Sequence, residues 1–60
     1  MYFIQVQWNK KGRYALLRPD GTTTARYLYA MFFDTLQDAK NVMEDMINQN
    51  PDHNFKIIKK

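Results

Sequence analysis

The residues that could carry out acid–base or metal chemistry are few. His53 follows Asp52 directly, an arrangement that could move a proton, but no nucleophile or second acid stands near it in the sequence. Asp38, Asn41 and Asp45 recur at helical spacing and could gather a divalent cation, yet a calcium loop needs a glycine turn that this stretch lacks. We therefore interpret the first pair as turn residues and the acidic group as a solvated helix face.

Composition removes most other catalytic arrangements. The chain of 60 residues contains no cysteine, no serine, one histidine and one glutamate. A disulfide framework, a thiolate zinc site and a serine or cysteine nucleophile are therefore excluded. We expect no catalytic residue, no metal, no cofactor and no small-molecule substrate, and hence a protein that is not an enzyme.

Length and composition also define the class of chain. Sixty residues form one domain with a single small core, over residues 1–60 and without a linker. Hydrophobic residues at 45% and aromatic residues at 15% are typical of a chain that folds. The longest apolar run, residues 27–33, is far shorter than the roughly 20 residues of a membrane span, and the first residues lack a secretory signal. We expect a cytoplasmic protein with no membrane association.

Two turn signals divide the first half of the chain into three antiparallel strands. Residues 9–12 and 18–21 each combine turn-forming side chains with a final glycine, and the second turn also contains a proline. Apolar and polar residues alternate on both sides of the first turn, as in a half-buried strand. The predicted strands cover residues 2–8, residues 13–18 and a segment within residues 26–33.

The geometry of the first turn sets the predicted register. If it is a type I turn followed by a bulge, Val6 lies opposite Leu16 and Trp8 lies opposite Tyr14, and these side chains are expected on the sheet face that the helix covers. The register of the third strand is less constrained. We expect residues 22–24 to widen the second loop or to form a bulge, in preference to a direct pairing of strand two with Thr22.

The clearest pattern in the sequence is that of an amphipathic helix. Thr35 can cap its start, and Asp38 follows in the first turn, where a carboxylate is favoured by the helix dipole. Pro51 ends the helix near residue 48 or 49. The apolar residues at helical spacing, which we expect to face the core, are Leu36, Ala39, Val42, Met43, Met46 and Ile47.

A short final strand over residues 54–59 completes the order β-β-β-α-β, an α+β domain with the helix packed on one sheet face. In this strand Phe55 and Ile57 lie on one side and Ile58 on the other. One helix covers one face, so the second face is expected to be open to a partner. Ala15 and Phe55 are expected on that face together with the predicted partner surface, which consists of Phe3, Gln5, Gln7, Arg13, Leu17, Tyr27 and Tyr29.

Charge is distributed unevenly along the chain. Residues 1–30 carry five basic and one acidic residue, a net +4, whereas residues 31–54 carry one basic and five acidic residues, a net −4. Three lysines in the last six residues restore the total of +3. Basic hairpin tips and C-terminal lysines among aromatic residues could bind single-stranded nucleic acid by stacking and phosphate contacts. The predicted contacts are Lys10, Lys11, Arg13, Arg18, Arg26 and Lys56.

Resemblance to known proteins is general. The stretch from Phe33 to Ala39 resembles the strand-to-helix junction of many small α+β domains. A short chain that starts at its own methionine is similar to accessory proteins of bacteriophages and other bacterial mobile elements. We expect a binding module that associates with a protein partner or forms a homodimer, through the open sheet face or an edge strand, because so small a chain cannot hide all its apolar residues. Nucleic-acid binding is the alternative.

Overall fold

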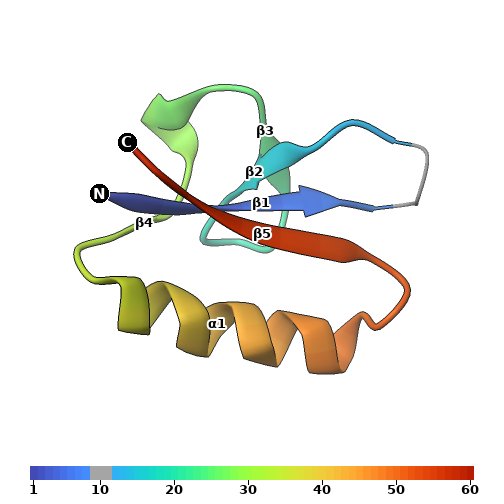
Figure 1. The fold of residues 1–60 in the computed structure, drawn as a ribbon. Helices are drawn as coiled ribbons and strands as arrows, with labels where there is room; N and C mark the ends of the chain where they lie inside the picture. Colours follow the sequence, from blue (N-terminus) through green and yellow to red (C-terminus); the bar gives the residue numbers. More distant parts are fainter. Residues whose placement is uncertain (9–11) are drawn as a thin grey trace.

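An antiparallel sheet lies across a single helix in the computed structural model of the chain, which describes residues 1–8 and 12–60 (Figure 1). The predicted α+β fold class is confirmed, with a helix that contacts the sheet and a C-terminal strand that pairs with the first strand. The elements are, in order, β1 (Tyr2–Gln7), β2 (Ala15–Leu17), β3 (Thr23–Thr24), the 3₁₀ helix η1 (Tyr27–Tyr29), β4 (Phe32–Phe33), α1 (Leu36–Gln49) and β5 (Asn54–Lys59).

Strand β1 is the centre of the sheet. Strand β5 pairs with it along its whole length, from Tyr2 opposite Lys59 to Gln7 opposite Asn54. Because β5 occupies one edge of β1, β2 and β4 share the other: β2 pairs near the end of β1 and β4 near its start. The amide of Met31, just before β4, donates a hydrogen bond of 2.9 Å to the carbonyl of Leu17 in β2.

Helix α1 begins and ends where the sequence predicts. The hydroxyl of Thr35 accepts a hydrogen bond of 3.2 Å from the amide of Asp38, which satisfies one of the free donors of the first turn. At the other end the amide of Asn50 donates to the carbonyl of Met46, and Pro51 follows. Helix α1 therefore has a fixed start beneath β4 and a fixed end before β5.

Replacing Thr35 by alanine is expected to lower the free energy of unfolding by about 1 kcal/mol, because the amide of Asp38 loses its acceptor. Urea unfolding followed by the fluorescence of the single tryptophan measures this change. Thr35→Ser keeps the hydroxyl and should retain most of the stability. Equal losses in both variants would contradict the role of the hydroxyl as the cap.

The larger core lies between the sheet and α1. Ile4, Val6 and Leu17 are buried there, and side chains from α1 and β5 pack against them. Two of the helix residues predicted to be core, Leu36 and Ile47, are instead 41% exposed, because they lie at the margins of the apolar stripe. The remaining members of this cluster are Trp8, Met31, Phe33, Val42, Met43, Met46, Phe55 and Ile57. Phe55 therefore lies on the helix side of the sheet, and its prediction for the open face is wrong.

The predicted register of β1 and β2 is wrong by one residue. Val6 lies opposite Ala15, and Gln5 lies opposite Leu16. A shift of one residue moves every side chain of a strand to the other face of the sheet. Ala15 and Leu17 therefore lie on the helix side, whereas Tyr14 and Leu16, predicted to face the helix, lie on the opposite side.

The third strand was predicted correctly only in its location. Strand β4 does lie within residues 26–33, but it pairs with β1, and the strand that pairs with β2 is β3, at Thr23–Thr24. The second turn closes tightly, since the amide of Arg18 donates 2.8 Å to the carbonyl of Thr22 and Gly21 has a φ of 87°. Strand β3 is therefore only two residues long, and the predicted wide loop is absent from this turn. Both the amide and the hydroxyl of Thr22 donate to Asp20, and these hydrogen bonds, the hydroxyl's first, lower the pKa of the Asp20 carboxyl.

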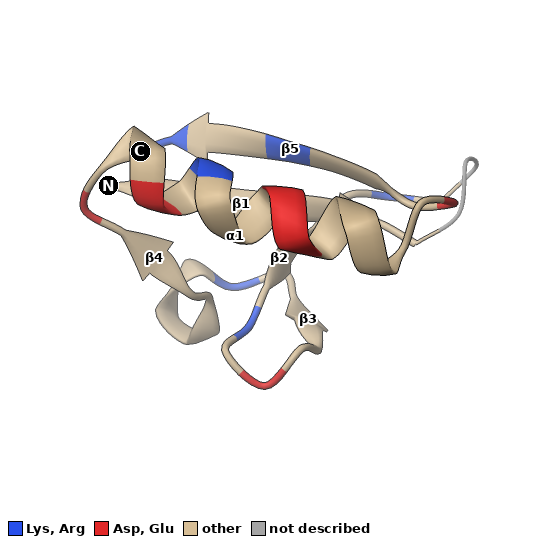
Figure 2. Cartoon of the chain, turned by 90° about the horizontal axis from the view of Figure 1, so that it is seen from below, with Lys and Arg blue, Asp and Glu red and all other residues tan. Residues whose placement is uncertain are grey.

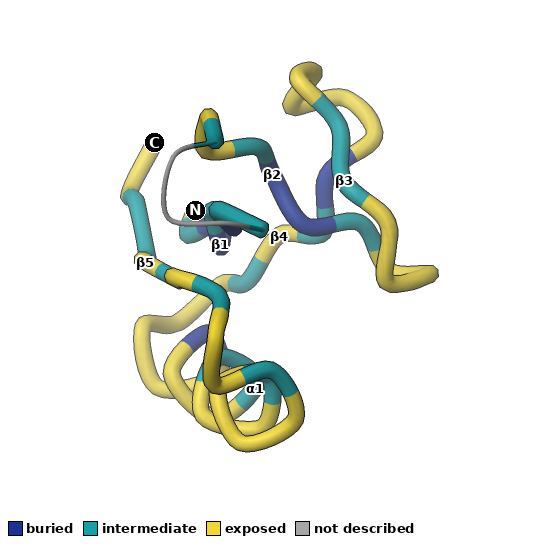
Figure 3. The backbone as a smooth tube through the Cα atoms, turned by 90° about the vertical axis from the view of Figure 1, so that its right-hand side faces the viewer, coloured by how far each residue is buried: buried dark blue, intermediate teal, exposed yellow. Residues whose placement is uncertain are grey.

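Residues 25–31 cover part of the sheet face that we expected to be open. Phe3 and Leu16 are buried on that face together with Ala30, and Ile58 packs against them. The ring of Tyr27, in η1, meets Phe3 edge-on at 4.8 Å between centroids. In Figure 3 the buried stretches of the backbone, in dark blue, include parts of β1 and β2 and a part of α1. The domain thus has a second, smaller core away from α1.

Candidate functional site

The residues predicted to form the partner surface do not form one surface. Phe3 and Leu17 are 6% and 2% exposed and lie in the two different cores, so neither is accessible. Gln5 and Gln7 are half-buried on the face away from α1. The exposed members of the set are Arg13, Tyr27 and Tyr29.

Only some of the residues predicted to contact nucleic acid are both described by the structure and exposed. Lys10 and Lys11 lie outside the described residues. Arg18 is half-buried, and its guanidinium lies 5.9 Å from the centre of the Tyr29 ring. The exposed members of the set are Arg13, Arg26 and Lys56.

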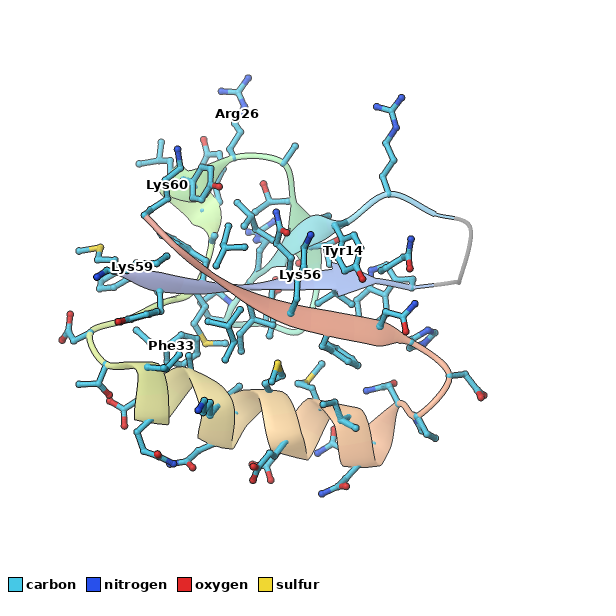
Figure 4. The ribbon with its side chains drawn as sticks, viewed as in Figure 1. Tyr14, Arg26, Phe33, Lys56, Lys59 and Lys60 are labelled. Carbon is cyan, nitrogen blue, oxygen red and sulfur yellow. The ribbon has the colours of Figure 1, made fainter. Side chains whose placement is uncertain are left out.

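Two lysine–tyrosine pairs lie on the sheet face away from α1. The Nζ atom of Lys56 lies 4.3 Å from the centre of the Tyr14 ring, and that of Lys60 lies 4.9 Å from the centre of the Tyr27 ring. In Figure 4, Lys56, Tyr14, Lys60 and Arg26 all lie on the opposite side of the sheet from the helix. We call Tyr14, Tyr27, Lys56 and Lys60 the tyrosine–lysine face.

Strand alternation explains why the two lysines share this face. Lys56 lies opposite Gln5, and Ile58 lies opposite Phe3 in the smaller core. Successive side chains of a strand point to opposite faces, so Lys56, Ile58 and Lys60 follow one another on the same side. Lys59 points the other way, lies opposite Tyr2, and has its Nζ atom 5.8 Å from the Tyr2 ring centre.

Each tyrosine is supplied by a different element. Tyr14 precedes β2 and lies on the face of Leu16, because the observed register brings it to the side away from α1. Tyr27 begins η1 and is held against Phe3. Both rings remain partly open, at 37% and 40% exposure. The face therefore combines accessible aromatic rings with ammonium groups.

Two glutamine side chains of β1, Gln5 and Gln7, lie on the same side of the sheet as the tyrosine–lysine face. Gln7 donates from its amide to the carbonyl of Gly12 and accepts a hydrogen bond of 2.7 Å from the amide of Asn54. Gln5 lies between Leu16 and Lys56 in the register of the sheet. The hydrogen bonds of Gln7 tie the end of β1 to the segment before β2 and to the first residue of β5.

Charge has opposite signs on the two sides of the domain. Helix α1 carries Asp38, Glu44 and Asp45 against Lys40. In Figure 2, which views the domain from below, most red segments lie on α1 or beside its two ends, one lies on the turn between β2 and β3, and β5 carries blue ones. The face away from α1 has Lys56, Lys60 and, near η1, Arg26. Such a separation attracts anions to one side of the domain and repels them from the other.

The catalytic and metal candidates do not converge on a site. The ring of His53 meets Trp8 edge-on at 5.0 Å, and its buried Nδ1 atom has no hydrogen-bond partner in the described residues. Within residues 1–8 and 12–60 there is neither a pocket nor a group of three side chains able to hold a metal. No helix of the described chain has the length and apolar character required to cross a membrane.

Sequence reasoning missed Tyr14, because the predicted register turned it toward the helix. The signal that locates Lys60 beside Lys56 was present in the alternation of residues 56, 58 and 60 along the final strand. No family model, curated protein or solved structure matches this chain. Inference about function therefore depends on the geometry of the tyrosine–lysine face.

Proposed function

We propose that the protein is a non-catalytic module that binds nucleic acid through the tyrosine–lysine face. The observation that carries this proposal is the pairing of two exposed lysines with two partly open tyrosine rings on the side of the sheet away from the acidic helix. Ammonium groups neutralise phosphates, and aromatic rings stack on bases. Both requirements are met on one face.

The burial of Phe3 and Leu17 favours nucleic acid over a protein partner at this face. A protein interface of this size depends on a desolvated apolar centre, and these two residues would have supplied most of it. Their side chains are already used in the two cores of the domain. The accessible groups of the tyrosine–lysine face itself are phenol rings and ammonium groups, which suit an anionic partner with flat bases.

The salt dependence of binding tests the proposal. Fluorescence anisotropy of a labelled oligonucleotide should show binding at low salt, with an affinity that falls steeply as salt rises. In the double variant Lys56→Gln/Lys60→Gln, two phosphate contacts are lost, so the slope of log affinity against log salt should decrease in magnitude by about 1.4 to 1.8. The matched control is Lys40→Gln, which removes a cation from α1 and should leave the slope unchanged.

Two results would remove this proposal. The first is the absence of binding to single-stranded and duplex oligonucleotides at low salt. The second is an equal change of slope in the Lys40→Gln control, since that would show a general effect of net charge and no contact at this face.

A protein partner remains a second candidate because two large apolar side chains are exposed. Leu28, in η1, is 82% exposed, and Phe32, in β4, is 55% exposed. Sedimentation over a wide concentration range tests self-association, and Leu28→Asp should abolish a dimer formed through Leu28. A strict monomer that captures no partner would remove this candidate, while the nucleic-acid proposal depends on its own measurement.

A further inference from the structure

We infer that the nucleic acid bound by the tyrosine–lysine face is single-stranded, with Tyr14 and Tyr27 each stacking on an unpaired base and Lys56 and Lys60 on the adjoining phosphates. This inference rests on the proposed function and adds the form of the ligand and the role of each side chain.

The spacing of the two pairs suits a strand that runs along β5. Lys56 and Lys60 are separated by four residues, which is about 13 Å along an extended strand. They lie on one side of β5, each beside a ring from another element. A single strand can therefore present successive bases to Tyr14 and Tyr27 while its phosphates follow the lysines.

The rings offer the surface that a base needs. An ammonium group lies over each ring, and Tyr14 and Tyr27 are 37% and 40% exposed, so part of each ring is reachable from solvent. An exposed cation–π contact contributes only about 0.5 to 1 kcal/mol, whereas stacking of a base contributes about 1 to 3 kcal/mol. A base can therefore displace the lysine from the ring, and the released ammonium group is then beside the phosphate.

A duplex does not fit this face. Bases in a duplex are stacked on one another, and their flat surfaces cannot reach Tyr14 or Tyr27. The major groove admits a helix or a two-stranded ribbon, but α1 is acidic and lies on the opposite side of the sheet. The β2–β3 hairpin has strands of three and two residues and an aspartate at its turn.

Anisotropy with a labelled 12-nucleotide strand, alone and annealed to its complement, tests the inference at one salt concentration. We expect the single strand to bind at least tenfold more tightly than the duplex. Tyr14→Leu should weaken single-strand binding by about tenfold, since one stacked base is lost. Tyr14→Phe retains the ring and should bind like the original chain. Tyr29→Leu removes an exposed ring outside the tyrosine–lysine face and should have no effect.

The outcomes separate this inference from the function on which it rests. Equal or tighter binding of the duplex, or unchanged single-strand binding by Tyr14→Leu, would overturn the inference and leave nucleic-acid binding in place. Loss of binding in Tyr14→Leu and Tyr14→Phe alike would also overturn it, because the ring would not be the determinant. Absence of binding to either form would overturn the function as well. Thermal unfolding of each variant confirms that the mutated chain is folded.

Discussion

Replacing Leu17 by alanine is expected to lower the free energy of unfolding by about 3 kcal/mol. The side chain is 2% exposed and packs with Ile4 and Val6 in the core beneath the sheet, and a buried leucine truncated to alanine loses about 2 to 5 kcal/mol. A domain of 60 residues has a total stability of about 3 to 9 kcal/mol. The variant should therefore keep about 0 to 6 kcal/mol of stability and unfold at a clearly lower urea concentration, as measured by urea titration and tryptophan fluorescence.

Leu28→Ala is the matched control, because the same atoms are removed from a side chain that is 82% exposed. Its stability should change by less than about 0.5 kcal/mol. If Leu17→Ala does not fold well enough to titrate, Leu17→Val gives a smaller loss that can be measured. Leu17→Ala as stable as Leu28→Ala would contradict the observed register and place Leu17 on an open face.

Replacing Phe3 by alanine is expected to cost about 3 to 5 kcal/mol, although Phe3 lies on the face away from α1. Its ring is 6% exposed, and it holds Tyr27 through an edge-on contact at 4.8 Å. Such aromatic contacts add about 0.5 to 1.5 kcal/mol to the burial of the rings. Chemical unfolding of the variant measures the loss.

Phe3→Leu separates burial from the aromatic contact, since it fills most of the volume and lacks the ring. Its loss of stability should be clearly smaller than that of Phe3→Ala. In the folded fraction of Phe3→Leu, Tyr27 loses its edge-on partner, so binding of a single strand should also weaken. A cost below 1 kcal/mol for Phe3→Ala would mean that residues 25–31 do not cover this face.

The sequence was most informative where local signals agree. Thr35 as a cap, Pro51 as a stop and the apolar stripe between them predict α1 within one residue. The final strand was predicted with its observed bounds, Asn54–Lys59, and with Phe55 and Ile57 on one side and Ile58 on the other. These elements depend on side-chain periodicity and on turn residues that lie within the element or beside it.

The register of β2 could not be obtained from periodicity. Ala15, Leu16 and Leu17 are all apolar, so either phase of the alternation gives an apolar face. The choice then depended on an assumed turn geometry over residues 9–12, and an error of one residue exchanged the faces of Leu16 and Leu17.

The third strand was predicted only in part, for a related reason: β4 lies within the predicted range, but η1 occupies the residues before it. Residues 27–33 form a continuous apolar run, and such a run does not distinguish a strand from a helical turn. The factor that decides is tertiary packing, because β2 already pairs with the end of β1 on this edge. The chain therefore leaves the sheet after Thr24 and forms η1 over Phe3. It then returns as β4, which pairs with the start of β1.

Part of the candidate site could be predicted from the sequence. The separation of a basic sheet from an acidic helix follows from counting charges along the chain, and Arg26 and Lys56 were named from it, whereas Tyr27 was named for the open sheet face. The pairing of Tyr14 with Lys56 joins residues 42 positions apart (56 − 14) and needs the correct register of both neighbours of β1. No local pattern carries that information.

The central claim is that one face of this sheet binds single-stranded nucleic acid, and titration of the isotope-labelled protein with a 12-nucleotide single strand at low salt tests it most directly. Amide chemical shifts in the ¹⁵N–¹H spectrum report contacts residue by residue. We predict saturable changes centred on Tyr14, Tyr27, Lys56 and Lys60, with α1 unaffected. Changes centred on α1, or an unchanged spectrum at millimolar oligonucleotide, would contradict the claim.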